Sequence, residues 1–276
     1  MVVVSLGDNI ELLDSFSAST LVINGIKKNI LWRMSSWEIA ARTKYQAKSK
    51  EDYIILLKRS FKSINEINKI KLMICMKKVK ELLSITNSFE NIPFRFAYLS
   101  GDIDWGYTYT IDDIIVLRDR DFFRSEDDLV ELIIHEYCHV YQRYYIDMLS
   151  DLYNSWGFTK KNILDLPKVN TAVNPDGLDT WTFKYNGDEY CSILIGQSNG
   201  YFIPYAVKIK DNSFTNLGTE INNLDGFANN FFNMRQLYHP NEIMATLMPL
   251  YLKKELKPTN ESQKKVLDQL KKWVNK

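Results

Sequence analysis

The sequence has few of the residues that build metal or redox centres: three cysteines and three histidines among 276 residues. Cys75, Cys138 and Cys191 lie far apart, and no two of them form a Cys-x-x-Cys pair. This spacing supports neither a thiolate zinc knuckle nor a disulfide framework. We therefore expect the protein in the cytoplasm or another reducing compartment, where unpaired thiols persist.

Long apolar runs are also missing, and none approaches the length that spans a bilayer. The N-terminal stretch MVVVSLGDNIELLD has a short apolar run without a basic start, which is not typical of a signal peptide. The formal net charge of +1 gives no overall field that would attract nucleic acid or an anionic membrane. We expect neither of these as a partner.

The first third of the chain, residues 1–90, is expected to form a helical N-terminal region. Residues 50–85, KEDYIILLKRSFKSINEINKIKLMICMKKVKELLSI, repeat apolar side chains at helical spacing. This repeat predicts a pair of amphipathic helices with their lysines turned to solvent. The expected apolar face comprises Ile54, Leu57, Phe61, Ile64, Ile67, Ile70 and Leu72.

Residues 91–256 are expected to form the main domain. The segments PFRFAYLS, DWGYTYT and DIIVLRD predict short strands of a small sheet. Residues 125–156 contain neither proline nor glycine and predict one helix, with Ser125 as its N-cap and Gly157 as its stop.

Further along, a β insertion is expected at about 179–210. Asn186-Gly187 between two alternating runs predicts a hairpin. The run YFIPYAVKIK predicts a further strand, which Pro204 places at a sheet edge. Residues 257–276 predict a C-terminal amphipathic helix capped by Asn260. Strands and helices in this order predict an α+β fold.

The segment ELIIHEYCHVYQR, residues 131–143, holds two of the three histidines, four positions apart. On a helix such residues lie on one face, so His135 and His139 can bind one zinc ion (Zn2+) without backbone strain. Glu136 lies beside that face, where its carboxylate can take a proton from a zinc-bound water. The spacing therefore predicts two metal ligands and a general base.

The stretch LIIHEYCHVYQ resembles the active-site helix of the zincin metallopeptidases over about ten residues. The resemblance implies a small mixed sheet packed on this helix, a mainly helical second part, and peptide or protein substrates. It also implies that His135 and His139 are zinc ligands and that Glu136 is the catalytic base. By the same analogy, DIIVLRD is the edge strand along which an extended substrate lies.

A catalytic zinc needs a third protein ligand, and LYHPNEIMATLM offers Glu242 and His239. Pro240 suits the first helical position, which places Glu242 in the first turn. The segment resembles the Asn-Pro-x-Glu-x-x-Ala pattern of gluzincins, zincins whose third ligand is glutamate, with His239 in place of the asparagine. We expect Glu242 as the ligand, and His239 as the alternative ligand or as an oxyanion donor.

Several neighbouring side chains have weaker claims. Further candidates for the oxyanion donor are Tyr201, Tyr205 and Tyr238. Glu131 is expected to be solvated or to orient a ligand. Gln142 is expected either to line a cleft or to lie at the surface. Residues 174–177, Asn-Pro-Asp-Gly, predict a turn.

Two other interpretations stay open beside a zinc metallopeptidase. In one, a catalytically idle zincin-fold protein serves as a binding or structural component of an assembly, and the 179–210 insertion covers the cleft. In the other, the helix binds no metal and its histidines form hydrogen bonds with the backbone.

Overall fold

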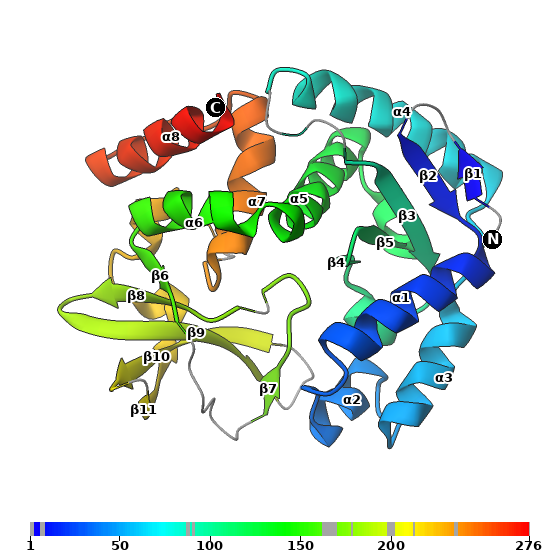
Figure 1. Ribbon diagram of the computed structural model, residues 1–276, viewed down its shortest axis with the longest axis horizontal. Helices are drawn as coiled ribbons and strands as arrows, with labels where there is room; N and C mark the ends of the chain where they lie inside the picture. Colours follow the sequence, from blue (N-terminus) through cyan, green and yellow to red (C-terminus); the bar gives the residue numbers. More distant parts are fainter. Residues whose placement is uncertain are drawn as a thin grey trace. The chain divides into compact units, whose positions relative to one another are not determined.

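In the structure, a computed structural model, the chain divides into two units. The structure describes residues 3–5, 9–86, 89, 92–161, 170–177, 179–197, 202–211, 213–234 and 237–275. Unit 1 comprises residues 1–85 and 89–143, and unit 2 comprises residues 86–88 and 144–276. Within the described ranges, eight α-helices and eleven strands in two sheets confirm the α+β class (Figure 1). No helix among these residues is long and apolar enough to cross a membrane.

Unit 1 contains a five-stranded mixed sheet. In spatial order its strands are β1 (Val3–Ser5), β2 (Ile10–Leu13), β3 (Phe94–Leu99), β5 (Ile114–Arg118) and β4 (Tyr109–Ile111). Strands β2, β3 and β5 run parallel, and β1 and β4 pair antiparallel at the edges. The predicted edge strand DIIVLRD is β5, which lies inside the sheet, so that prediction is wrong. Every residue of β5 is buried, as expected of a strand covered on both faces.

In the sequence, the helices of unit 1 lie between and after the strands of this sheet. They are α1 (Ser15–Asn29), α2 (Ser36–Arg42), α3 (Lys50–Ser60), α4 (Glu66–Leu83) and α5 (Glu126–Tyr144), with short 3-10 turns η1 (Ile103–Gly106) and η2 (Asp119–Phe123). The region 1–90 is therefore mainly helical but also supplies β1 and β2. Helix α5 packs on the sheet through Tyr137, whose ring stacks on that of Phe94 at 3.9 Å between centroids.

The predicted pair α3 and α4 is present, but α4 does not bury the expected face. Its buried side chains are Leu72, Cys75, Met76, Val79 and Leu83. Ile67 and Ile70, which the sequence placed in the apolar face, are exposed. Helix α4 carries apolar residues on two sides, and periodicity alone cannot say which side packs on the protein.

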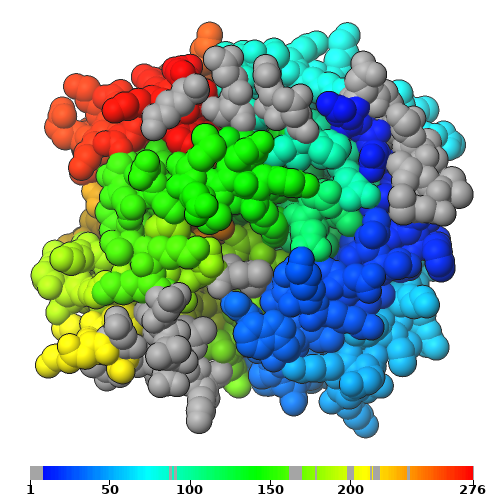
Figure 2. Space-filling view, viewed as in Figure 1, coloured from blue at the N-terminus to red at the C-terminus, as the bar shows by residue number. Residues whose placement is uncertain are grey.

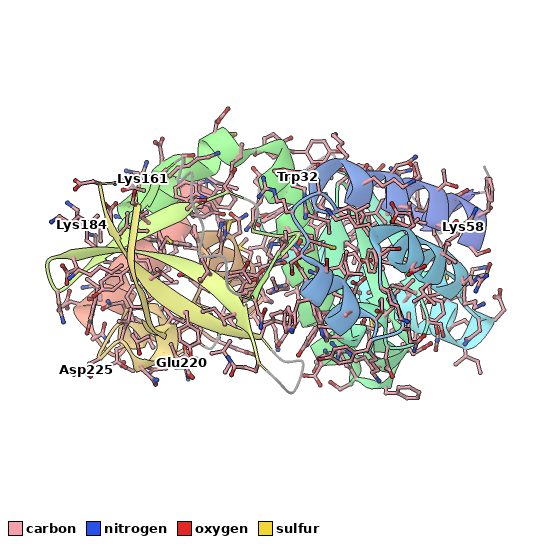
Figure 3. All side chains as sticks on the ribbon, turned by 90° about the horizontal axis from the view of Figure 1, so that it is seen from below. Trp32, Lys58, Lys161, Lys184, Glu220 and Asp225 are labelled. Atoms are coloured by element: carbon pink, nitrogen blue, oxygen red, sulfur yellow. The ribbon has the colours of Figure 1, made fainter. Side chains whose placement is uncertain are left out.

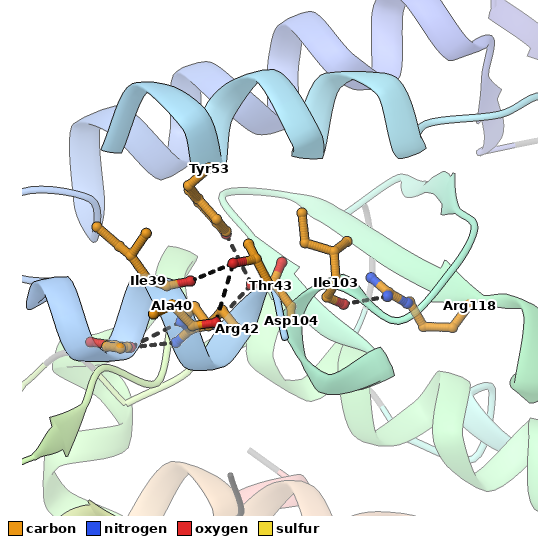
Figure 4. Close-up of polar contacts among 9 residues, drawn as sticks. Ile39, Ala40, Arg42, Thr43, Tyr53, Ile103, Asp104 and Arg118 are labelled. Atoms are coloured by element: carbon orange, nitrogen blue, oxygen red, sulfur yellow. Dashed lines mark hydrogen bonds and ion pairs between the residues drawn. The ribbon is translucent and has the colours of Figure 1, made fainter. Parts of the chain in front are cut away.

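A buried polar cluster holds the loop that leads into β4 (Figure 4). Arg42 donates hydrogen bonds to Glu38 and to Asp104, and the Tyr53 hydroxyl also donates to Asp104. Asp104 and Trp105 both have φ of 55°, a left-handed conformation that non-glycine residues rarely adopt. The contacts of the Asp104 carboxylate keep the loop in this conformation and so fix the start of the edge strand.

Unit 2 contains a second, antiparallel sheet. The sheet has the strand order β11-β10-β9-β8-β6, with β7 also paired to β9. Its elements are α6 (Ile146–Ser155), β6 (Phe158–Lys160), β7 (Thr171–Ala172), β8 (Trp181–Tyr185), β9 (Asp188–Gly196), β10 (Phe202–Lys210), β11 (Ser213–Glu220), η3 (Ile221–Asn223), η4 (Ala228–Phe231), α7 (Pro240–Leu252) and α8 (Glu261–Val274). The prediction of a mainly helical second part is therefore wrong, because the insertion belongs to a full sheet.

Aromatic rings build the core of unit 2. Phe183 stacks on Phe227 at 4.5 Å between centroids, and Phe158 and Phe231 extend the cluster. Charged side chains such as Lys184 and Asp225 lie at the surface (Figure 3). Sheet and helices of this unit are thus held by apolar burial.

The predicted hairpin is confirmed, and the predicted edge strand is not. Asn186 and Gly187 both have positive φ, as a two-residue turn between β8 and β9 requires. Strand β10 has β9 on one side and β11 on the other, so it is an inner strand. Pro204 is tolerated because pairing with β11 begins one residue further on, at Tyr205.

The predicted helix 125–156 is divided into α5 and α6. Its start is as predicted, since the Ser125 hydroxyl accepts a hydrogen bond from the Asp128 amide. Its end is also as predicted, because Gly157 follows α6 with φ of 93°. The break lies at Tyr145, with φ of −129° and ψ of 33°. Nothing in the local sequence explains it, since no proline or glycine is near.

Candidate metal centre

Helix α5 brings His135 and His139 together on one face. Their Nε2 atoms lie 3.2 Å apart, and their rings stand at 83° to each other. Zinc–nitrogen bonds of about 2.0–2.1 Å in tetrahedral geometry place two ligand nitrogens roughly 3.3 Å apart. The two imidazoles therefore already have the separation that a shared zinc ion needs.

Gln142 fixes the orientation of one of these rings. Its side chain is buried, and its Oε1 lies 2.8 Å from Nδ1 of His139. An amide oxygen can only accept, so Nδ1 of His139 carries the proton and Nε2 offers its lone pair to a metal. The sequence placed Gln142 in a cleft or at the surface, and the structure instead makes it a partner of a candidate ligand. Its position three residues after His139 on one helix was the available signal.

Glu136 is buried and oriented from the sheet. The Thr110 hydroxyl of β4 lies 2.8 Å from Oε2 of Glu136 and 3.3 Å from its backbone oxygen. Since a carboxylate only accepts, Thr110 donates to it and holds the carboxyl group in one orientation. Thr110 was not predicted from the sequence, because it belongs to another element of the chain.

Arg143 ties the same strand to the same helix. Its Nη1 donates to the His139 carbonyl at 3.0 Å, and its Nη2 donates to the Thr110 carbonyl at 2.9 Å. These two bonds and the Thr110 hydroxyl join β4 to the segment that carries the motif. These hydrogen bonds therefore fix the position of the edge strand relative to the helix that carries the two histidines.

The cysteine inside the motif has no part in this arrangement. Cys138 is completely buried, and burial together with the nearby Glu136 charge raises the pKa of its thiol. It stays protonated and makes a poor metal ligand. Cys75 and Cys191 are also buried and unpaired with other cysteines. Glu131 is half-buried on the same helix, and its role as a partner of a ligand stays a prediction.

Glu242 lies in unit 2, in the first turn of α7, as predicted. Its carboxylate is buried, and two donors hold its Oε1. The Tyr238 hydroxyl donates to it at 3.0 Å, and Nδ2 of Asn174 donates to it at 2.8 Å. Asn174 also donates to the Tyr238 oxygen, so each of the three side chains is hydrogen-bonded to the other two. The sequence indicated only a turn at Asn174.

His239 caps the helix that carries Glu242. Its Nδ1 accepts a hydrogen bond from the Asn241 amide at 3.2 Å, and its Nε2 lies 2.9 Å from the Asp179 carbonyl. A methyl group on Gly177 would come within 3.1 Å of the imidazole, so a larger residue there would have to displace the ring by a few tenths of an ångström. The ring thus has an N-cap role. Its predicted roles as zinc ligand or oxyanion donor stay predictions.

Among the residues that the structure describes, one group of three or more His, Cys, Asp and Glu could hold a metal ion. It consists of His135, His139 and Glu242, whose ligand atoms all lie within 4.8 Å of one another. Two imidazoles and one carboxylate are a donor set that suits catalytic zinc. Of the weaker candidates, Tyr205 lies in β10, and Tyr201 lies outside the described residues.

Comparisons of the chain with models of known protein families, with curated proteins and with solved structures gave no match. The chemistry of the side chains is therefore the basis for assigning a function.

Proposed function

We propose that this protein is a zinc-dependent metallopeptidase of the gluzincin type, which hydrolyses peptide bonds. In this proposal His135, His139 and Glu242 hold the zinc, and Glu136 is the general base. The observation that carries it is the 3.2 Å separation of the two histidine Nε2 atoms, with the tautomer of His139 set by Gln142. A hydrogen-bond partner on the second nitrogen of a ligand imidazole is usual in metal sites, because it fixes the tautomer and the ring orientation.

Each side chain then has a defined task. Zinc, when bound, polarises the attacking water and the peptide carbonyl. Glu136 accepts the proton that the water loses as its oxygen bonds to the carbonyl carbon. The same carboxyl group delivers that proton to the amide nitrogen as the carbon–nitrogen bond breaks. Thr110 keeps one carboxyl oxygen of Glu136 oriented through this exchange.

The fold of unit 1 supports the zincin-like part of the proposal. A mixed sheet packs on the motif-bearing helix, and its edge strand β4 supplies Thr110 to Glu136. In the described part of the sheet, β4 has a neighbour on one side only. Edge strands are where an extended peptide adds by main-chain hydrogen bonding. We therefore assign β4 the substrate role that the zincin resemblance implied for DIIVLRD.

The test is to replace the proposed base without touching the ligands. Glu136→Gln keeps the shape of the side chain and removes its ability to take a proton. We expect this variant to bind zinc as the wild type does and to cleave peptides roughly 10²- to 10⁴-fold more slowly. The measurement is cleavage of a peptide library by mass spectrometry, with bound zinc determined by elemental analysis.

Glu126→Gln is the matched control, because it removes a carboxylate from the exposed start of the same helix. It should keep both zinc and activity. A Glu136→Gln variant that retains zinc and cleaves as fast as the wild type would disprove the mechanism. A wild type that binds zinc but cleaves no peptide would favour the idle zincin-fold interpretation.

A further inference from the structure

The outer face of α4 is apolar although it faces solvent. Four side chains on it are exposed: Ile67 by 80%, Ile70 by 57%, and Met73 and Ile74 by 45% each. They follow one another at spacings of about one helical turn, so they form one stripe along the helix. Figure 2 shows α4, in cyan, at the surface of the molecule. Single exposed apolar residues are common, but a continuous stripe indicates a binding surface.

Phe123 enlarges this stripe from the neighbouring turn η2. It is 87% exposed. The Lys71 ammonium donates to the carbonyls of Phe122 and Arg124 on either side of it, which places Phe123 beside α4. Lys71 lies one helical turn from both Ile67 and Ile74. The α4 stripe, defined as Ile67, Ile70, Met73, Ile74 and Phe123, is therefore one patch.

The size of the patch is that of a protein interface core. The exposed fractions add up to about three whole side chains. An aromatic side chain buries ~150–250 Å² and an aliphatic one less, so the stripe presents roughly 300–500 Å². A stable interface buries about 800 Å² on each partner. A polar rim around the stripe would supply the rest.

The charges at the ends of the stripe identify the partner. On the same exposed face, Glu66 precedes the apolar residues and Lys77 follows them. The 3.6 Å contact of Glu66 with Lys69 is a surface ion pair, which is weak enough to exchange for another cation. An acid at one end and a base at the other make the face complementary to itself when two copies run antiparallel. We infer that α4 forms the interface of a two-fold symmetric dimer of this chain. This inference does not depend on the proposed zinc chemistry.

The register of the dimer follows from the spacing. Ile67, Ile70, Ile74 and Lys77 have the 3-4-3 spacing of a coiled-coil seam. Antiparallel packing centred between Ile70 and Ile74 places Ile70 against Ile74 of the second copy. It also places Lys77 beside Ile67 and Glu66 of the second copy, where its stem packs and its ammonium pairs. Two-fold symmetry makes each of these contacts twice.

The oligomeric state of the full chain tests this inference. Sedimentation equilibrium of the wild type at about 1 to 100 micromolar should give twice the chain mass at the upper end. Ile70→Glu should weaken the dimer by about tenfold or more, because it buries a charge at the centre of the interface. Ile55→Glu, at an exposed isoleucine of α3 outside the patch, should leave the dimer intact. Circular dichroism verifies that both variants fold.

Charge reversal tests the antiparallel register. Glu66→Lys and Lys77→Glu should each weaken the dimer, and the double variant should restore it, because the two charges only exchange places. A wild type that is monomeric at about 100 micromolar would overturn the inference. A dimer that persists in Ile70→Glu would also overturn it. A monomeric wild type that needs Ile70 to bind lipid vesicles or another protein would overturn it as well.

Discussion

At the scale of single residues, Thr110 shows how a side chain outside the motif can control the proposed base. Its hydroxyl orients the Glu136 carboxyl group from strand β4. Thr110→Val keeps the shape of the side chain and removes the donor. We expect kcat to fall about 10- to 100-fold, since a hydrogen bond to a charged group contributes about 1.5–3 kcal/mol. KM and zinc affinity should change little, because the hydroxyl acts on the proposed base and not on a ligand.

Thr110→Ser is the control for this prediction, because it keeps the hydroxyl and loses only a methyl group. Steady-state kinetics on a cleaved peptide, with zinc affinity measured by chelator competition, separates the variants. If Thr110→Ser were as slow as Thr110→Val, packing and not the hydrogen bond would be responsible. If Thr110→Val kept the wild-type kcat, Thr110 would have no role in orienting the base.

The same residues show what the sequence could predict about the site. His135, Glu136 and His139 were predictable because they lie within five positions, where helical geometry fixes their relation. The N-cap Ser125 and the turn Asn186-Gly187 were predictable for the same local reason. Thr110 was not, because its contact with Glu136 depends on how a strand packs on a helix.

At the scale of elements, the start of α7 is held by the turn at residues 174–177. Nδ2 of Asn241 donates to the Asp176 carbonyl at 2.8 Å, which ties the first turn of the helix to this segment. Asn174 and Tyr238 both donate to Oε1 of Glu242. Because these two donors hold one carboxylate oxygen, we expect the other oxygen of Glu242 to be the one that binds a metal.

Removing one of the donors should therefore weaken metal binding. We expect Asn174→Ala to lower zinc affinity about 10- to 100-fold, the usual effect of losing a hydrogen-bond partner of a ligand. Tyr238→Phe should act in the same direction. Asn223→Ala, at an exposed asparagine of the same unit, is the control and should bind zinc as the wild type does.

Zinc affinity is measured by competition with a chromophoric chelator, so the result does not depend on peptide cleavage. If Asn174→Ala and Tyr238→Phe bound zinc normally while Glu242→Ala did not, the donors would have no positioning role. If Glu242→Ala also bound zinc normally, Glu242 would not be a ligand.

Elements were less predictable than the motif, for reasons that particular segments show. Helix α4 has apolar residues on two sides, and packing chose the side with Leu72 and Val79 over the side with Ile67 and Ile70. Strand β2 was missed because its local partner β1 has only three residues and its other partner β3 lies more than 80 residues further along the chain. Such long-range pairing leaves no local sequence signal.

At the scale of the whole molecule, the proposed ligands come from distant parts of the sequence. Zinc should therefore bind the folded chain much more tightly than the unfolded one and stabilise it by mass action. At a free zinc concentration of about 100 times Kd, this stabilisation is about 2.7 kcal/mol. A chain of this size shifts its Tm by roughly 2–4 °C per kcal/mol, so a chelator should lower Tm by about 5–10 °C.

Two variants distinguish zinc bound by the proposed ligands from zinc bound elsewhere. His135→Ala should have the lower Tm already and should not respond to the chelator, because it lacks a ligand. Glu136→Gln should respond as the wild type does, because the proposed base is not a ligand. Differential scanning calorimetry with and without chelator measures all three proteins. An equal response of His135→Ala and the wild type would mean that zinc binds elsewhere, and the spacing of the two imidazoles would then need another explanation.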